Sequence, residues 1–150
     1  MLREQINDSL KTAVKAQDRR RTCTLRLVNA AIKDRDIAAR GNGKESVDDA
    51  EIQQILGKMV KQREESVQIY EQAGRMELAE QEREEMEIIR DFLPRQMSEE
   101  EVKVACTRAV EDIGASGLRD MGRTMSALKE RYPGQMDFGR ASCMVKQILN

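Results

Sequence analysis

Histidine and tryptophan are absent from this 150-residue sequence, and aromatic residues make up only 3% of it. The lack of histidine removes the commonest general base and the commonest metal ligand, so the expectation of catalysis falls. The sequence has two prolines and few of the β-branched and aromatic residues that fill strands, whereas charged residues make up 35%. This composition predicts an all-α protein.

Long apolar runs are also missing. No stretch of about 18 apolar residues occurs, so we expect no membrane span and no membrane partner. The first residues, Met1 to Gln5, lack the basic-then-apolar pattern of a secretory signal peptide. We therefore expect a cytoplasmic protein.

Cysteine is scarce and widely spaced. The three cysteines are Cys23, Cys106 and Cys143, and none belongs to a Cys-x-x-Cys pair. A disulfide framework and a zinc site are not expected, which fits a reducing compartment. Each cysteine lies in or beside an apolar helix face without an activating neighbour, so we expect all three to pack in cores.

The net charge of −1 is distributed unevenly. Residues 1–40 contain ten Lys/Arg and five Asp/Glu, and residues 102–150 contain eight and five. Residues 41–74 contain four and seven, and residues 75–101 contain four and ten. Two basic ends are thus separated by an acidic middle.

Four helices are predicted before Pro94, because apolar residues recur there at three- and four-residue steps. Asp18 is the expected N-cap of the second helix, and Ser46 with Asp49 should cap the third. Gly74 separates the third and fourth helices, which we expect to form a long antiparallel hairpin. The four predicted helices cover about residues 2–17, 19–40, 47–73 and 75–93.

The second predicted helix is apolar around most of its circumference, which predicts packing on two sides. Its first turn contains three cations, which are unfavourable next to the positive end of the helix dipole. Either phosphate contact or ion pairing would explain them. The three cations are Arg19, Arg20 and Arg21; one apolar face has Leu25, Val28 and Ile32, and the other has Cys23, Leu27, Ala30 and Ala31.

A short joint divides the chain. Pro94 should end the fourth helix, and Ser98 with Glu101 has the spacing of a capping box for the next one. Because few residues separate the two helices, we expect two domains joined closely, residues 1–94 and residues 95–150.

Three helices are predicted after the joint. Gly114 should end the first, Ser116 should cap the second, and Asp137 should cap the third after a turn at Pro133-Gly134. The predicted architecture is therefore an N-terminal four-helix part with a long hairpin, followed by a small three-helix C-terminal bundle. A core of this size has marginal stability by itself.

No catalytic constellation is apparent, and we expect no catalytic residue, no cofactor and no metal. Glu80, Glu84 and Glu87 could line one face of a helix as carboxylates do in di-iron bundles, but such sites also use a Glu-x-x-His element. The alternative is a solvated face with Glu–Arg pairs. The segment Gly41 to Lys44 does not match a glycine-rich phosphate loop.

Basic residues of the last fifty positions fall outside the apolar stripes of their helices. If the stripes face inward, these side chains lie on the outer surface around the Pro133-Gly134 turn and could contact a phosphate backbone. A mildly basic, solvated surface is the alternative. Without aromatic residues to stack on bases, such a surface would recognise shape and charge. The candidate RNA-binding residues are Arg119, Arg123, Lys129, Arg131, Arg140 and Lys146.

Several separate motifs, in order along nearly the whole chain, resemble the GatB/YqeY family and its free-standing YqeY-like members. They are Leu25 to Lys33, Gln72 to Arg75 with Leu78 to Glu80, Phe92 to Glu101, Gly114-Ala115, Asp120 to Met125, and Gly134 to Ser142 with Val145-Lys146. The motif positions that we single out as structural are Pro94, Ser98, Asp120, Met121, Gly122, Met125 and Gly134.

The resemblance implies a C-terminal domain related to the tail of the B subunit of the glutamine-dependent tRNA amidotransferase. In that enzyme the tail helps to hold Glu-tRNA or Asp-tRNA, and the catalytic modules lie elsewhere. Nothing in these residues resembles those modules, so any amidotransferase activity would need other subunits.

Two functions follow as hypotheses. The first is a non-catalytic tRNA-binding or tRNA-associated accessory protein that uses the basic C-terminal surface. The alternative is an adaptor that binds a protein partner through the acidic hairpin, with amidotransferase association by family kinship only.

Overall fold

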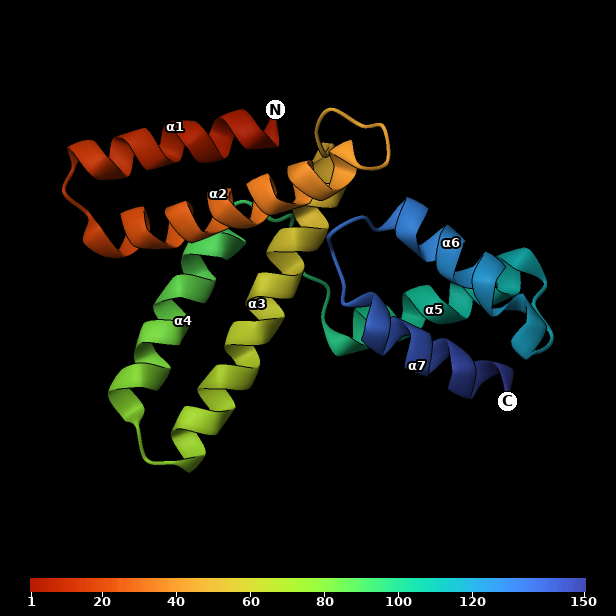
Figure 1. Ribbon diagram of the computed structural model, residues 1–150. Helices are drawn as coiled ribbons and strands as arrows, with labels where there is room; N and C mark the ends of the chain where they lie inside the picture. Colours follow the sequence, from red (N-terminus) through yellow and green to blue (C-terminus); the bar gives the residue numbers. More distant parts are fainter. The chain divides into compact units, whose positions relative to one another are not determined.

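The computed structural model describes residues Met1–Asn150 and contains seven α-helices, one short 3-10 helix and no strand. The all-α prediction is therefore confirmed. The chain forms two compact units, Met1–Pro94 and Arg95–Asn150, drawn from red to green and from green to blue in Figure 1. None of the helices is both long enough and apolar enough to cross a membrane.

The N-terminal unit consists of a helix pair and a hairpin. In Figure 1 α1 runs antiparallel to α2, and α3 and α4 run antiparallel to each other. Gly74 adopts a left-handed φ of 73° between α3 and α4, a conformation that favours glycine. The four helices are α1 (Leu2–Lys15), α2 (Arg19–Arg40), α3 (Asp49–Gln72) and α4 (Met76–Arg90).

One core holds these four helices together. It combines residues from every helix of the unit with Val47 from the α2–α3 loop, and Phe92 and Leu93 pack against it after α4. Fully buried members include Ile6, Leu25, Val28, Ile52, Leu56 and Ile89. The hairpin is thus attached to α2 through shared apolar packing, since α2 contacts both α3 and α4.

Only one of the two predicted apolar faces of α2 is fully covered within this unit. Leu25, Val28 and Ile32 are buried, but Leu27 is 50% exposed and Cys23 is also exposed. Ala31 of the second face also packs against the core, so the contacts of α2 with α1, α3 and α4 leave Cys23, Leu27 and Ala30 exposed.

The expectation that Ser46 and Asp49 cap α3 is wrong. Asp48 is the N-cap: its carboxylate accepts a hydrogen bond from the amide of Glu51 at 2.9 Å, and the Glu51 carboxylate accepts from the Asp48 amide at 3.1 Å. Asp49 instead accepts from the amide of Leu2. Aspartate is as good an N-cap as serine, so the position was decided by where the α2–α3 loop reaches the core.

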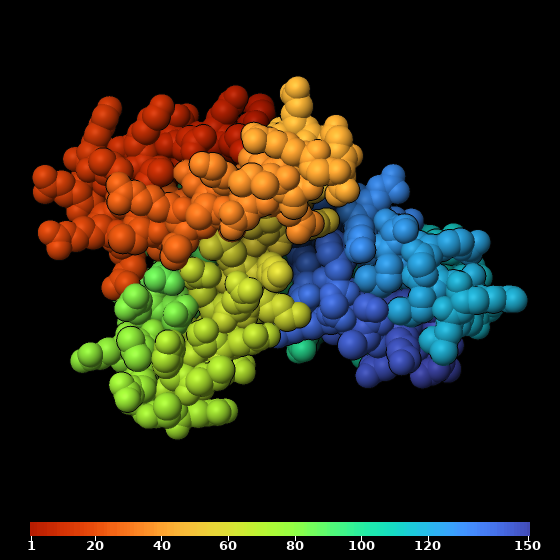
Figure 2. Space-filling view, in the orientation of Figure 1, coloured from red at the N-terminus to blue at the C-terminus, as the bar shows by residue number.

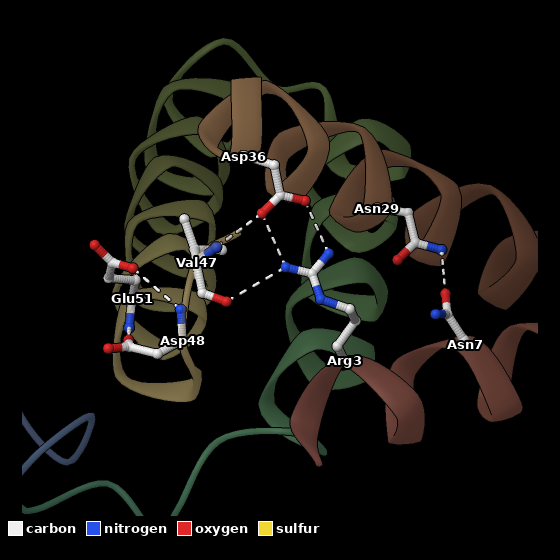
Figure 3. Close-up of polar contacts among 7 residues, drawn as sticks. All are labelled: Arg3, Asn7, Asn29, Asp36, Val47, Asp48 and Glu51. Atoms are coloured by element: carbon white, nitrogen blue, oxygen red, sulfur yellow. Dashed lines mark hydrogen bonds and ion pairs between the residues drawn. The ribbon is translucent and has the colours of Figure 1, made fainter. Parts of the chain in front are cut away.

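A partly buried ion pair joins α1, α2 and this loop (Figure 3). The two oxygens of Asp36 accept hydrogen bonds from the Arg3 guanidinium at 2.9 Å each, and one of them also accepts from the Val47 amide at 2.9 Å. Asn29 donates to Asn7 further along the same helix pair. These bonds hold the pKa of Asp36 below its usual range, chiefly through Arg3 and then Val47.

The arginine run at the start of α2 makes contacts inside the unit. Arg20 forms an ion pair with Glu84 at 3.2 Å, and Arg21 pairs with Asp91 at 3.1 Å while its guanidinium lies over the Phe92 ring. Of the two explanations for the run, ion pairing therefore applies to Arg20 and Arg21.

The C-terminal unit is a three-helix arrangement in which every pair of helices is in contact. It comprises α5 (Glu99–Ile113), the 3-10 turn η1 (Leu118–Asp120), α6 (Met121–Arg131) and α7 (Phe138–Leu149). Its core contains Val102, Cys106, Ala109, Leu128, Met136 and Val145.

The residues after Pro94 belong to this unit by their hydrogen bonds. The Met97 amide donates to the carbonyl of Gln135 at 2.9 Å, and the Gln96 side chain donates to the carbonyl of Gly134 at 2.8 Å. The stretch that leads into α5 is therefore fastened to the turn between α6 and α7.

The cysteine prediction is wrong for two of the three residues. Cys106 is buried in the core of the C-terminal unit, and burial raises the pKa of its thiol. Cys23 and Cys143 are exposed. Both lie beside an apolar stripe, and a position one step off a stripe is as compatible with the surface as with the core.

Candidate nucleic-acid interface

The C-terminal unit presents its cations on helices whose apolar stripes face inward. Leu128 of α6 and Ala141 and Val145 of α7 are fully buried. The side chains on the opposite sides of these helices must therefore face solvent. All six candidate residues, Arg119, Arg123, Lys129, Arg131, Arg140 and Lys146, are exposed.

Two of the six contact the end of α5. Arg123 donates to the carbonyl of Ile113 at 3.2 Å, and Arg131 forms an ion pair with Asp112 at 2.8 Å. These carbonyl and carboxylate oxygens lie at the C-terminal end of a helix, where cations are favourable. The structure therefore brings Arg123 and Arg131 together at one place and gives both a local partner.

Arg140 also has a partner nearby in the sequence, but the distance between the two charged groups is long. Its guanidinium lies 3.8 Å from the carboxylate of Asp137, the N-cap of α7. A pair this long on an exposed side chain contributes little to stability and leaves the cation accessible.

The remaining three candidates, Arg119, Lys129 and Lys146, make no ion pair within 4 Å, although the charge of Arg119 helps to lower the pKa of Asp120. Lys129 and Arg131 lie roughly 200° apart around α6 at 3.6 residues per turn, so they project from opposite flanks of the helix. The six residues therefore cover several sides of α6 and α7. Lys103 and Arg108 on α5 are exposed cations as well, so exposure alone does not single out the six candidates.

Most motif residues have structural roles in this unit. Ser98 caps α5 by accepting from the Glu101 amide at 3.2 Å, but the capping box is incomplete because the Glu101 carboxylate bonds to Arg95 and to the Ser98 hydroxyl. Met121 and Met125 pack against the core, and Gly134 has a left-handed φ of 71° in the turn before α7.

Asp120 organises the start of α6 in place of Ser116. The expected Ser116 cap is wrong: the Asp120 carboxylate accepts from the Ser116 amide at 3.0 Å, and residues 118–120 form the 3-10 turn before α6 begins. Backbone hydrogen bonds from Ser116 and then Gly117 lower the pKa of Asp120. Gly122 is exposed, with open space around its Cα, so packing does not require glycine there.

The acidic helix α4 of the N-terminal unit forms Glu–Arg pairs. Arg83 pairs with Glu80 and Glu71, Arg90 pairs with Glu87 and Glu64, and Arg63 pairs with Glu85. No group of three or more carboxylate or cysteine side chains is placed to hold a metal ion. The carboxylates of α4 thus act largely within the hairpin and toward α2.

These features define a small all-helical protein with two compact units and an exposed set of cations on the second. The chain matches the Yqey-like protein family over residues 3–149 and belongs to that family.

Two relatives are fungal proteins, each named altered inheritance of mitochondria protein 41, mitochondrial. The chain is 32% identical to the one from Clavispora lusitaniae over an alignment of 144 residues, and this alignment covers 93% of this chain and 80% of the relative. It is 31% identical to the one from Lachancea thermotolerans over 88 residues, which are 59% of this chain and 46% of the relative.

Proposed function

We propose that this chain is a non-catalytic accessory protein that binds tRNA through cations of its C-terminal unit. The observation that carries the proposal is the presence of Arg119, Lys129 and Lys146 on exposed positions without intramolecular ion pairs. Such cations are available to replace the counterions of a phosphate backbone, which is the main source of sequence-independent affinity for nucleic acids.

The resemblance of this unit to the tRNA-holding tail of the amidotransferase B subunit supports the same proposal. A cytoplasmic location belongs to the proposal, whereas the names of both fungal relatives place those proteins in mitochondria. The surface has no exposed aromatic platform, so we expect recognition of the shape and charge of folded tRNA.

Salt-dependent binding tests this function. We expect the affinity for total tRNA to fall steeply with salt, and the triple variant Arg119→Ala/Lys129→Ala/Lys146→Ala to reduce the log–log slope by about 2 to 3. The measurement is fluorescence anisotropy of labelled tRNA at a series of salt concentrations.

The matched control removes three exposed cations of the N-terminal unit, as Lys11→Ala/Lys15→Ala/Lys58→Ala. This control should leave the slope nearly unchanged, which separates a local interface from a general loss of positive charge. An absence of tRNA binding at low salt would contradict the proposal.

An adaptor function is the second candidate, and one observation favours it. Ile69, Met76 and Leu78 are exposed around the Gly74 turn of the hairpin, with exposed fractions of 63%, 57% and 38%. An apolar tip of this kind suits a protein partner. The internal pairing of the α4 carboxylates reduces the charge that the hairpin can offer, so tRNA binding is the first proposal.

A further inference from the structure

The outward side of α2 carries a regular pattern that no contact within the N-terminal unit uses. Five exposed residues recur at alternating four- and three-residue steps, which is the spacing of a helix-pairing face. We call them the outer face of α2: Cys23, Leu27, Ala30, Asp34 and Ile37. Leu27 and Ile37 are 50% and 56% exposed, so this face has large apolar surface without a cover.

A row of cations borders this face along the whole helix. Arg19, Arg26, Lys33 and Arg40 follow one another at seven-residue intervals, and all four are exposed. We call them the basic row. If the residues of the outer face are taken as the a and d positions of a heptad repeat, every member of the row occupies a g position. Charges at g positions select the partner helix. The row extends about 31 Å along α2.

The basic row differs from the other cations of the same helix. Arg20 and Arg21 form ion pairs with α4 and the segment after it. No member of the row forms an ion pair, although the charge of Arg40 helps to lower the pKa of Asp36. Figure 2 shows the orange atoms of α2 uncovered along the drawn side of the N-terminal unit, beside the red atoms of α1. All members of the row and of the outer face are exposed, so the charges and the apolar face are accessible together.

From this arrangement we infer that the outer face of α2 binds an amphipathic helix of a partner protein that carries carboxylates on one flank. The partner's apolar side covers Leu27 and Ile37, and its carboxylates, repeated every seven residues, pair with the basic row. Charge complementarity of this type fixes register and selects the partner, while each exposed pair adds little affinity.

Other occupants fit the same residues less well. A phosphate backbone would neutralise the row but leave Leu27 and Ile37 exposed. Insertion into a bilayer would bury Asp34, and the small side chains of Cys23 and Ala30 would contribute little apolar area.

The α2 helix of a second copy also fails to fit. In a parallel pair the basic row would face Thr24, Ala31 and Ala38, which offer no carboxylate. In an antiparallel pair the row would face its own cations, and like charges at these positions are repulsive.

Two synthetic peptides of about three heptads test the inference on the full chain. The acidic peptide has leucine at the core positions and glutamate at both flanking positions, and the control peptide has lysine in place of glutamate. We expect fluorescence anisotropy to show binding of the acidic peptide at least about tenfold tighter than the basic one, with the difference shrinking at high salt. Equal binding, or no binding of the acidic peptide, would overturn the inference.

Charge reversal shows whether α2 is the site. Arg26→Glu/Lys33→Glu should lose affinity for the acidic peptide and gain affinity for the basic one, whereas Lys11→Glu/Lys58→Glu should keep the original preference. Circular dichroism melting curves check that both variants fold. If the charge-reversal variant does not fold, Arg26→Ala/Lys33→Ala takes its place. An unchanged preference in the folded reversal variant would place binding elsewhere and overturn the inference.

The exposed thiols provide a footprint of the bound peptide. In Cys143→Ser, Cys23 is the exposed thiol, because Cys106 is buried, and the acidic peptide should slow its alkylation by iodoacetamide. In Cys23→Ser, the alkylation of Cys143 should be unaffected. Protection of Cys143 in place of Cys23 contradicts the inference. The inference is also contradicted if the parent chain does not bind the acidic peptide, and Arg26→Glu/Lys33→Glu instead loses binding to tRNA, binding to anionic vesicles or self-association.

Discussion

At the scale of single residues, Asp36 shows how one buried charge can join three segments. Its carboxylate accepts three hydrogen bonds, two from Arg3 on α1 and one from the amide of Val47 in the α2–α3 loop. The Asp36 side chain is 12% exposed and that of Arg3 is 34% exposed. Removing the charge of one partner leaves the other without compensation, which costs more than an exposed pair would contribute.

We predict that Asp36→Asn lowers the free energy of unfolding at neutral pH by roughly 2 to 3 kcal/mol. The difference from the parent chain should shrink as the pH falls below about 4. The reason is that the pKa of Asp36 is lower in the folded chain, so its stabilising effect is present above the unfolded pKa and is lost as the pH falls through the folded one. Urea unfolding followed by circular dichroism at several pH values measures both effects.

Asp34→Asn is the control, because Asp34 is exposed on the same helix. Its effect should stay within about 0.5 kcal/mol at neutral pH. If both variants cost the same, the Arg3–Asp36 pair would not be the source of the stability.

At the scale of elements, the helix ends depend on caps that only the folded loops identify. The start of α3 offered Ser46 as a cap in the sequence, and the structure uses Asp48 with Glu51. The start of α6 offered Ser116, and the structure uses a 3-10 turn around Asp120. Competing cap residues lie within a few positions of each other, so local preference alone cannot choose between them.

The two candidate caps of α3 make opposite predictions. Asp48→Ala should lower the free energy of unfolding by about 1 to 2 kcal/mol, because the orphan amide of Glu51 loses its acceptor. Ser46→Ala should change it by less than about 0.5 kcal/mol. Thermal unfolding of the two variants decides the assignment, and an equal loss in both would contradict the Asp48 cap.

At the scale of the whole molecule, the two units have cores of different size. The N-terminal core contains large aliphatic residues from four helices. The C-terminal core contains three alanines, one cysteine and five larger apolar side chains, of which only Leu128 and Val145 are fully buried. A small core with little apolar area gives limited stability. We therefore expect the two units to differ in how well they fold alone.

We predict that the fragment of residues 1–94 keeps a cooperative thermal transition, and that the fragment of residues 95–150 unfolds at lower temperature. The cut falls before Arg95 because Gln96 and Met97 bond to the turn before α7. Circular dichroism of both fragments and of the full chain provides the comparison. Loss of helicity in the first fragment would show that the chain folds as one domain.

Much of the fold follows from the sequence alone. The periodicity of Ile52, Leu56 and Val67 and the positions of Gly74 and Gly114 placed the helices and their ends to within a few residues, since these signals are local. The all-α class came from composition. The family motifs also lie in the sequence itself.

The tertiary structure alone decided which charges and apolar residues remain available. Arg20 and Arg26 look alike in the sequence, yet one pairs with Glu84 and the other has no partner. Leu25 and Leu27 differ as sharply, one fully buried and one half exposed. Pairing and burial depend on residues that are distant along the chain, so the surfaces on α2 and on the C-terminal unit become visible only after the helices have packed.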